Sequence, residues 1–474
     1  MKISILFAVV GSAALLAGQA LAQTPSPPAP GAAPAPPPAR QGPPPPPPPP
    51  AGWPTPGQPI EYLPKSAQGQ HQTPAWPTQT RAPYTPSHVK FQVQTFASGL
   101  EDPWGLAFLP DGRMLVTERP GNIRIVGKDG SLSSPIAGTP KVHIQQISGM
   151  QDVVLDPHFA RNHIIYWTYV EARGPEGPKT SSGVALAKGR LVDGPDPRVE
   201  DVQVIYRQKP DLVTEHSNYG GRMIFGADGY LYLTLGDRDG LDVRHYIQAL
   251  DNGVGKIVGI KSDGTAAPGG PFAGAKGALP EIWAYGLRNT LGIAWRGNTG
   301  QLWVVDVGPR GGDFLARVEP GKDYGWPLSR YGQEYSGEEV GKGPHLAGMQ
   351  EPNYYWDPVI SPSSLMFYDG KLFPAWKGSA FVTSLTQKHL VRLDMRGDRV
   401  VGEERLLADQ NQRLREVKEG PDGSIYVLTD EAKGRILRLA PSPGLVSRPR
   451  RGPYDGLATG GFRHGHHRRA EGAG

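Results

Sequence analysis

One histidine stands in a glycine-rich stretch where it could act as a base. The stretch runs from Glu215 to Arg222 with the sequence EHSNYGGR, and an apolar segment follows it directly. An imidazole titrates near neutral pH, so a positioned His216 could take a proton from a hydroxyl group and raise a reaction rate by roughly 10²–10⁴-fold. A structural histidine in a surface loop would give the same pattern, so the stretch alone leaves both interpretations open.

Two further stretches have residue types that bind anions and hard cations. Arg288 and Asn289 end the run YGLRN, and the run DVGPRGGD begins at Asp306. Glycines let the main chain approach a ligand closely, and exposed carbonyl oxygens are ligands that Ca²⁺ prefers. Arg413 and Arg415 are two residues apart, so on a strand both guanidinium groups face one side and could bind a molecule with several carboxylates. Taken singly, each arginine could equally be a solvated charge.

A recurring hairpin would position these stretches. It consists of a short apolar strand, a turn centred on glycine and a second strand rich in Val, Tyr, Leu and Thr; clear copies span 105–117, 223–234, 292–305 and 417–428, and weaker ones 153–169 and 366–382. Asp-Gly pairs supply the positive φ angles of tight hairpins. Six hairpins, each too small to bury its own apolar face, predict an all-β six-bladed β-propeller. Two tandem β-sandwiches are the alternative, but they do not require one pattern to recur.

The composition excludes several classes of chemistry and of partner. The 474 residues contain no cysteine, which excludes disulfides, thiolate zinc sites, iron–sulfur clusters and a cysteine nucleophile. The net charge of +5 comes from the two ends of the chain, because residues 84–440 hold 40 basic and 42 acidic residues. A near-neutral body argues against a nucleic-acid-binding core. The run GVGKIVG at 253–259 lacks the spacing of a dinucleotide fingerprint, so no nicotinamide cofactor is expected.

The sequence divides into four segments. Residues 1–22 have the charge, apolar stretch and small-residue pattern of a cleavable secretory signal, which predicts a periplasmic or secreted protein. Residues 23–86 hold 24 of the 51 prolines and are expected to be an extended, disordered linker. The propeller is expected over 87–440, and the basic, His- and Arg-rich residues 441–474 are expected to be a disordered tail. No segment is long and apolar enough to predict a stable membrane span.

Together with the runs DPWGL at 102–106 and PEIW at 280–283, these stretches resemble the soluble pyrroloquinoline-quinone (PQQ)-dependent sugar dehydrogenases. That family includes glucose and aldose sugar dehydrogenases with their sorbosone dehydrogenase relatives, and the resemblance covers about residues 95–440. It implies an enzyme whose six-bladed propeller binds PQQ and Ca²⁺ at one end of its axis. It further implies oxidation of the C1 hydroxyl of an aldose to a lactone, or of a related aldehyde, with electrons passing to an external cytochrome, quinone or dye.

The resemblance also implies roles for individual residues. His216 would take the hydroxyl proton as hydride passes to PQQ, Asp237 would orient the imidazole, and Arg288 would stabilise charge on the quinone oxygens. The other residues implied at the cofactor are Gln146, Asn289, Tyr335, Thr386, Arg413 and Arg415. The residues implied at calcium are Gly308 and Pro309, through their carbonyl oxygens, and Tyr324 at a second, structural site.

The chain departs from the family pattern at several positions. The family commonly places its histidine four residues before the arginine of the Gly-Gly-Arg stretch, whereas Asn218 stands there and His216 lies two residues earlier. Either the loop carries two extra residues or the base is missing. Thr386 replaces an expected lysine, and Gln146 is only approximately placed. These departures keep open a redox-inactive propeller that binds a carbohydrate or a protein. A calcium-dependent lactonase would instead need side-chain carboxylates around an axial metal.

Overall fold

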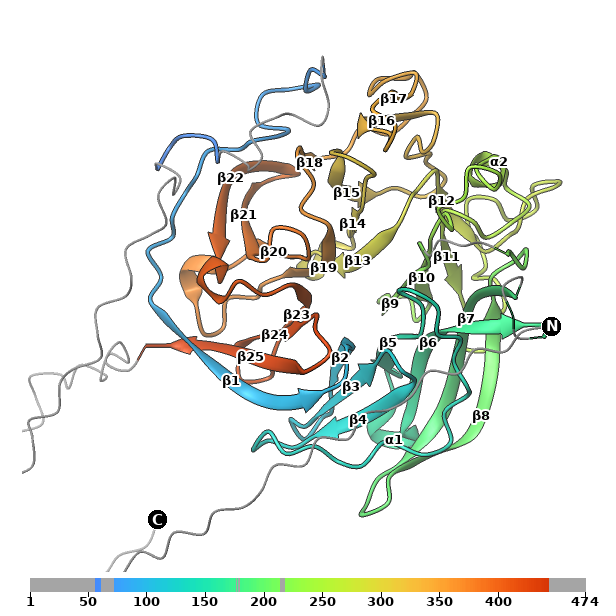
Figure 1. Ribbon diagram of the computed structural model, residues 1–474, viewed down its shortest axis with the longest axis vertical. Coiled ribbons are helices and arrows are strands. Elements are labelled where there is room, and N and C mark those ends of the chain that lie inside the picture. The colour runs from blue at the N-terminus through green and yellow to red at the C-terminus, as the bar shows by residue number, and fades with distance from the viewer. Residues whose placement is uncertain (1–55, 61–71, 176, 178–179, 214–217, 443–474) are drawn as a thin grey trace, which may run out of the picture. The chain divides into compact units, whose positions relative to one another are not determined.

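The computed structural model describes residues 56–60, 72–175, 177, 180–213 and 218–442. Six antiparallel sheets lie in a ring around a central axis, and the chain visits them in sequence order (Figure 1). The innermost strands of neighbouring sheets contact one another all the way round the ring. The expected six-bladed β-propeller is therefore confirmed, and the tandem β-sandwiches are not what forms.

Each blade begins at the axis and continues outward. The first two blades contain β2 (Pro103–Phe108), β3 (Met114–Glu118) and β4 (Asn122–Val126), then β5 (Met150–Leu155), β6 (Ile164–Arg173), β7 (Ser181–Val192) and β8 (Arg198–Arg207). The third and fourth contain β9 (Gly220–Phe225), β10 (Leu231–Leu235), β11 (Lys256–Ile260) and β12 (Ile282–Tyr285), then β13 (Thr290–Trp295), β14 (Leu302–Asp306), β15 (Asp313–Val318) and β18 (Tyr354–Trp356). The fifth contains β19 (Pro362–Phe367), β20 (Ala380–Ser384), β21 (Leu390–Arg396) and β22 (Arg399–Leu406).

The sixth blade takes strands from both ends of the propeller. Its inner strands are β23 (Leu414–Glu419), β24 (Ile425–Thr429) and β25 (Gly434–Pro441), and its outermost strand is β1 (Phe91–Leu100). β1 pairs with β25 from Phe91 opposite Pro441 to Leu100 opposite Gly434. Main-chain hydrogen bonds between the two ends therefore close the ring.

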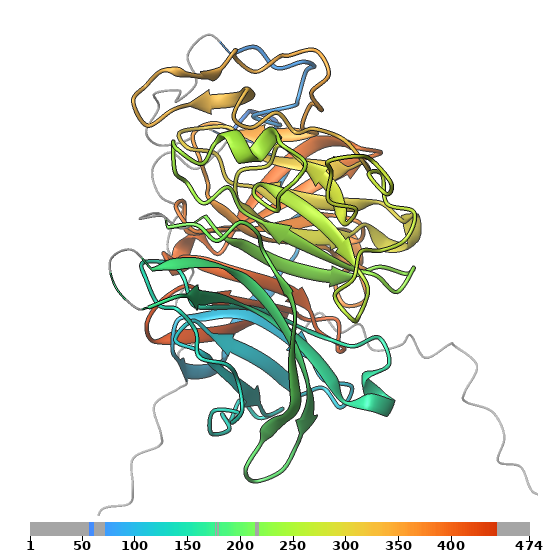
Figure 2. The same ribbon diagram turned by 90° about the vertical axis from the view of Figure 1, so that its right-hand side faces the viewer.

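Few elements lie outside the blades. A separate two-stranded hairpin is formed by β16 (Ser329–Gln333) and β17 (Glu339–Gly341), which stand beyond the fourth blade in both views (Figures 1 and 2). The helical segments are α1 (Phe159–Asn162), α2 (His245–Gln248) and the 3₁₀ turns Gly297–Thr299, Pro374–Trp376 and Ala408–Gln410. No helix in the described ranges has the length and apolar character needed to cross a membrane.

Local sequence explains the hairpins and the packing of the blades. At the first turn, the Asp111 carboxylate accepts the Arg113 amide at 2.9 Å and Gly112 takes a φ of 91°, which favours glycine. Asp228 and Asp422 accept main-chain amides in the same way. The second strands of five blades, β3, β10, β14, β20 and β24, are buried throughout, because neighbouring blades cover both of their faces. They therefore read as continuous apolar runs instead of alternating ones.

Residues 72–90 form a strap along the outer edges of the fourth and fifth blades. The Gln79 carbonyl accepts the Tyr355 amide of β18 at 2.8 Å, and the Thr85 amide donates to Glu403 of β22 at 3.0 Å. Residues 72–86 were expected to belong to a disordered linker, yet the structure packs them on the propeller. Side-chain hydrogen bonds fix them, as described below. The predicted signal at 1–22 and residues 443–474 of the predicted tail lie outside the described residues.

Candidate functional site

Ten of the eleven predicted site residues that the structure describes gather at one end of the propeller. The turns that carry Asp111, Asp228 and Asp422 each join the first two strands of one blade. These turns lie at the end of the propeller opposite to the predicted site residues. The connections that enter a blade, and those that join its second and third strands, share the other end, because successive strands are antiparallel. These connections and their continuations carry Gln146, Asp237, Arg288, Asn289, Gly308, Pro309, Tyr335, Thr386, Arg413 and Arg415. His216 lies outside the described residues.

Beneath this end, the side chain of Arg222 fills the axis. It projects from β9, is only 3% exposed and reaches all five other innermost strands. Its partners are the Trp104 ring of β2 at 4.0 Å, Asp152 of β5 at 3.4 Å, the Leu291 carbonyl of β13 at 2.7 Å, the Ser363 carbonyl of β19 at 2.9 Å, and the Glu416 carboxylate and Arg415 carbonyl of β23. One guanidinium group thus ties six blades together and forms the floor of the site.

Arg288 forms the centre of the first cluster above this floor. Its Nη2 donates to Asp239 at 2.9 Å and to the Tyr335 hydroxyl at 3.3 Å, and its Nη1 lies 3.3 Å from the Gly308 carbonyl oxygen. Burial disfavours its charge, but the carboxylates of Asp237 and Asp239 together raise its pKa above the ordinary value. Its Nε is buried without a hydrogen-bond partner among the described residues. Arg288 therefore keeps a positive charge and one unused donor at the site.

Asp237 is buried next to this cluster and holds an amide. Its Oδ1 accepts the side-chain amide of Asn218 at 3.0 Å, and its Oδ2 accepts the Trp326 indole nitrogen at 2.7 Å. Burial raises the pKa of Asp237, although the charge of Arg288 and the bond from Asn218 oppose the shift. The residue four positions before Arg222 is therefore the one that pairs with Asp237, and it carries an amide that cannot take up a proton near neutral pH.

The second cluster joins the two arginines that were predicted to bind carboxylates. The Asp430 carboxylate accepts Arg413 Nε at 2.7 Å and Arg415 Nε at 2.9 Å, while Arg415 also donates to the Ser363 hydroxyl at 3.2 Å. Burial alone would raise the pKa of Asp430, but the two guanidinium groups hold it below its ordinary value. Arg415 also stands 5.8 Å from the Trp104 ring, so this cluster sits over the same floor.

The remaining predicted cofactor residues have partners of their own. The side-chain oxygen of Asn289 accepts the Gly220 amide at 3.1 Å, so it fixes the start of β9. Thr386 is exposed and shares a 2.5 Å hydrogen bond with the Ser361 hydroxyl. Gln146 is exposed, and its main-chain carbonyl accepts a hydrogen bond from the Arg119 guanidinium at 2.5 Å.

The predicted calcium residues lie on two different features. Gly308 is held by its amide, which donates to Asp313 at 2.7 Å, and burial raises the pKa of Asp313 to about 6. The Tyr324 hydroxyl donates to the Arg317 carbonyl at 2.7 Å and accepts the Glu319 amide at 3.0 Å, so it is engaged within the fourth blade. The described residues contain no group of three His, Asp or Glu side chains that could hold a metal. A cation at Gly308 would have to rely on carbonyl oxygens.

Sequence reasoning missed three side chains that shape the site. Asp239 pairs with Arg288, Asp430 joins the arginine pair, and Trp326 holds Asp237. Asp430 follows Thr429, which lies opposite Leu414 in the β23–β24 ladder, so pairing these strands would have placed it beside Arg413. Nothing local to Asp239 or Trp326 signals a partner in another connection.

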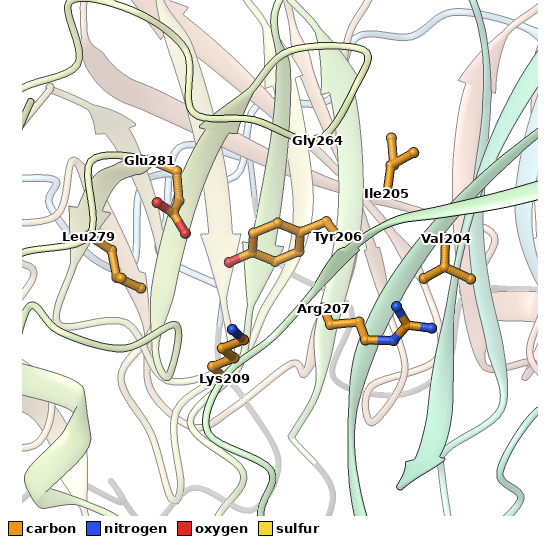
Figure 3. A pocket seen from close by; sticks show the side chains of 8 residues that line it. All are labelled: Val204, Ile205, Tyr206, Arg207, Lys209, Gly264, Leu279 and Glu281. Atoms are coloured by element: carbon orange, nitrogen blue, oxygen red, sulfur yellow. The ribbon is translucent and has the colours of Figure 1, made fainter.

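A cavity lies on the flank of the propeller, outside both clusters. Its volume is about 460 Å³, and β8 and the β11–β12 connection form its walls. The side chains of Tyr206, Lys209 and Glu281 point toward one another there (Figure 3). None of the predicted site residues lines it, so the end of the propeller remains the candidate site.

The two arginine clusters make this end suited to an anion with several carboxylates or carbonyl oxygens. Arg288, Arg413 and Arg415 supply three guanidinium groups whose planar donors match such oxygens. Asp430 already shows that one carboxylate can bind two of these groups at once. The exposed ring of Tyr335, beside Arg288, adds a flat surface at the entrance.

Comparison with known proteins identifies relatives of this chain. A family model described as "Glucose / Sorbosone dehydrogenase" matches residues 100–438. Aldose sugar dehydrogenase YliI of Escherichia coli is 39% identical over 352 residues, which cover 74% of this chain and 92% of that protein. A crystal structure of a glucose dehydrogenase is 42% identical with a TM-score of 0.70 and covers 74% of this chain and all of the other. The PQQ-bound form of an aldose sugar dehydrogenase from Streptomyces coelicolor is 26% identical with a TM-score of 0.59, covering 74% and 98%.

Proposed function

Because this chain belongs to the glucose/sorbosone dehydrogenase family, we propose that it is a PQQ- and Ca²⁺-dependent dehydrogenase of aldose sugars or related aldehydes. For an aldose, the C1 carbon loses a hydride and its hydroxyl loses a proton, which leaves a lactone. Two electrons then pass to an external acceptor, such as a cytochrome, a quinone or a dye. The observation that carries this proposal is the set of three arginines, Arg288, Arg413 and Arg415, at one end of the propeller.

Arg288, Arg413 and Arg415 would hold PQQ, which supplies the quinone that accepts the hydride. Arg413 and Arg415 would bind its carboxylates in the way that they already bind Asp430. The buried, partnerless Nε of Arg288 is a donor directed at no protein atom that the structure describes, which suits an oxygen of a bound group. Arg288 would stabilise negative charge that develops on that oxygen. Asn289 would act by fixing the start of β9, and Tyr335 and Gln146 would line the entrance.

The carbonyl oxygens of Gly308 and Pro309 would bind Ca²⁺, a cation that prefers oxygen ligands. The hydrogen bond between the Gly308 amide and Asp313 supports this role, because it fixes the turn. Gly308 also lies beside Arg288, so a cation there would adjoin the bound anion. We place no second calcium at the Tyr324 hydroxyl, because that atom is engaged by Arg317 and Glu319.

His216 would take the proton from the sugar hydroxyl. Asp237 would orient it through the Oδ2 lone pair that Trp326 leaves unused, because Oδ1 already accepts Asn218 and the Asp239 amide. We also propose a periplasmic or secreted location, because residues 1–22 have the pattern of a cleavable signal.

The test is reconstitution of the full chain. The purified protein is stripped with EDTA, supplied with PQQ and Ca²⁺ separately and together, and assayed for dye reduction with a panel of aldoses and aldehydes. We expect turnover only with both additions. A folded protein that takes up no PQQ, as judged by absorbance after gel filtration, would contradict the proposal.

One observation favours a second candidate, a redox-inactive propeller that binds a carbohydrate or a protein. Asn218 holds Asp237, the carboxylate that should orient the base, and an amide cannot replace an imidazole in proton transfer. The variant His216→Ala separates the two functions. Loss of turnover with PQQ still bound supports His216 as the base. A wild-type protein that binds PQQ and a sugar without any turnover supports the second candidate.

A further inference from the structure

The β16–β17 hairpin covers one side of the candidate site. Its turn carries Tyr335, whose side chain is 63% exposed and whose hydroxyl accepts Arg288 at 3.3 Å. The preceding Glu334 receives two hydrogen bonds from Arg244, at 2.7 and 2.9 Å. The hairpin therefore presents an aromatic ring where a substrate would enter. An isolated two-stranded hairpin is only marginally stable in water, so its position depends on what holds it.

On its outer side, the strap holds this hairpin through two glutamines. Gln72 forms two hydrogen bonds with the main chain of Gly332 in β16: its amide donates to the carbonyl at 2.6 Å, and its oxygen accepts the amide at 2.7 Å. Gln79 is fully buried, accepts the Tyr331 hydroxyl at 3.0 Å and donates to the Pro352 carbonyl at 2.9 Å. The strap thus grips β16 and also the connection that leads back from β17 to the fourth blade.

On its inner side, β16 packs without a gap against the Gly308–Gly312 turn. Main-chain hydrogen bonds at 2.7 and 3.1 Å join Gln333 to Arg310. A Cβ on Gly332 would collide with the Gly311 carbonyl oxygen, so the two main chains are as close as glycine allows. A shift of β16 would therefore also shift the Gly308–Gly312 turn, whose Gly308 carbonyl lies beside Arg288.

We propose that Gln72 and Gln79 are positioning residues: the strap fixes the β16–β17 hairpin, and the hairpin sets the affinity of the site for its sugar. The matched family model begins at residue 100, so both residues precede the part of the chain that it covers. The effect on sugar affinity rests on the proposed function, whereas the effect on the hairpin does not. Neither glutamine touches the reacting atoms, so the predicted effect falls on KM and leaves kcat nearly unchanged.

The test uses the full chain with Gln72→Ala and a matched control in the same strap, Thr78→Ala. Thr78 donates one hydrogen bond at 3.0 Å to Val400 of the fifth blade and makes none with β16. Amide hydrogen exchange is followed over residues 328–342. Because two main-chain contacts are lost, we expect exchange there to rise by about tenfold in Gln72→Ala and to stay at the wild-type rate in Thr78→Ala. Gln72→Glu, which keeps the acceptor and loses the donor, should fall between the two.

The same proteins are then assayed with the sugar that the reconstitution identifies. We expect KM to rise by about fivefold or more in Gln72→Ala with kcat within twofold of wild type. Unchanged exchange at 328–342 in Gln72→Ala overturns the proposal. Faster exchange with an unchanged KM overturns its second half, the link to affinity. If even the wild type oxidises no sugar, the proposed function fails, and the exchange rates alone decide whether the strap holds the hairpin.

Discussion

Replacing Arg222 with methionine should destabilise the whole propeller. The substitution keeps an apolar stem but removes the guanidinium group that contacts all six innermost strands. Asp152, which is almost completely buried, would then have no salt-bridge partner, and the equally buried Glu416 would keep only Lys418, 3.3 Å away. Leaving buried charges unpaired in this way costs about 3–5 kcal/mol in the free energy of unfolding. For about 350 residues the entropy of unfolding is about 0.7 kcal/mol/K, so the Tm should fall on the order of 5 °C.

The loss should depend on pH with a definite sign. Burial raises the pKa of Asp152 in the folded protein, and the charge of Arg222 opposes that rise. Without Arg222 the folded-state pKa rises further above the value of about 3.9 in the unfolded chain. The folded variant then binds a proton that the unfolded chain does not. Its stability relative to wild type should therefore recover as the pH falls from 7 toward 5.

Urea denaturation followed by tryptophan fluorescence measures this effect at pH 7 and pH 5. The matched control is Arg438→Met, which removes a surface pair with Asp422 whose side chains are 31% and 37% exposed. Such a pair contributes at most about 1 kcal/mol. The reasoning is refuted if Arg222→Met loses no more stability than Arg438→Met at pH 7, or if its deficit grows at pH 5.

Three further predictions concern the site. Arg415→Met should raise the dissociation constant of PQQ by about 10–100-fold in a reconstitution titration, because charge-assisted hydrogen bonds are lost; an equal shift in Arg438→Met would contradict a local role. Asn218→His puts an imidazole next to Asp237 and, added to His216→Ala, should restore part of the lost kcat; a double variant as inactive as His216→Ala would argue against Asp237 as the orienting group. Removal of Ca²⁺ with EDTA should abolish turnover, and re-addition of Ca²⁺ should restore it, because the Gly308 carbonyl would be one of its ligands. Activity that survives EDTA would count against a role for this metal.

The fold could be predicted because each blade contains a hairpin whose turn and strands can be recognised within a short stretch of sequence. Asp-Gly turns such as Asp111-Gly112 and buried second strands repeat in the sequence, and each repeat identifies one blade. The closing strand β1 could not be identified in the same way, because its pairing with β25 depends on the completed ring. The strap was missed for a related reason. Proline-rich composition predicts a linker, and only the tertiary contacts of Gln72 and Gln79 show that its last part is packed.

Part of the candidate site could be predicted. Arg288 was singled out by its glycine-containing run, and Arg413 and Arg415 by their spacing of two on a strand; the structure places all three at the same end of the propeller. Asp239 and Asp430 were missed because each acts on an arginine from another connection. Their roles follow only when the blades are assembled.

The pairing of β1 with β25 also determines when a newly made chain can finish folding. About 340 residues separate the two strands, so at about 5–20 residues per second roughly 20–70 s pass between their synthesis. Throughout that interval β1 has an unpaired edge that other chains could join. The innermost contacts wait a little more than half as long, because Arg222 and Glu416 are 194 residues apart. During synthesis this protein therefore spends most of its time as an open arc of blades, and aggregation competes with folding until the last strand arrives.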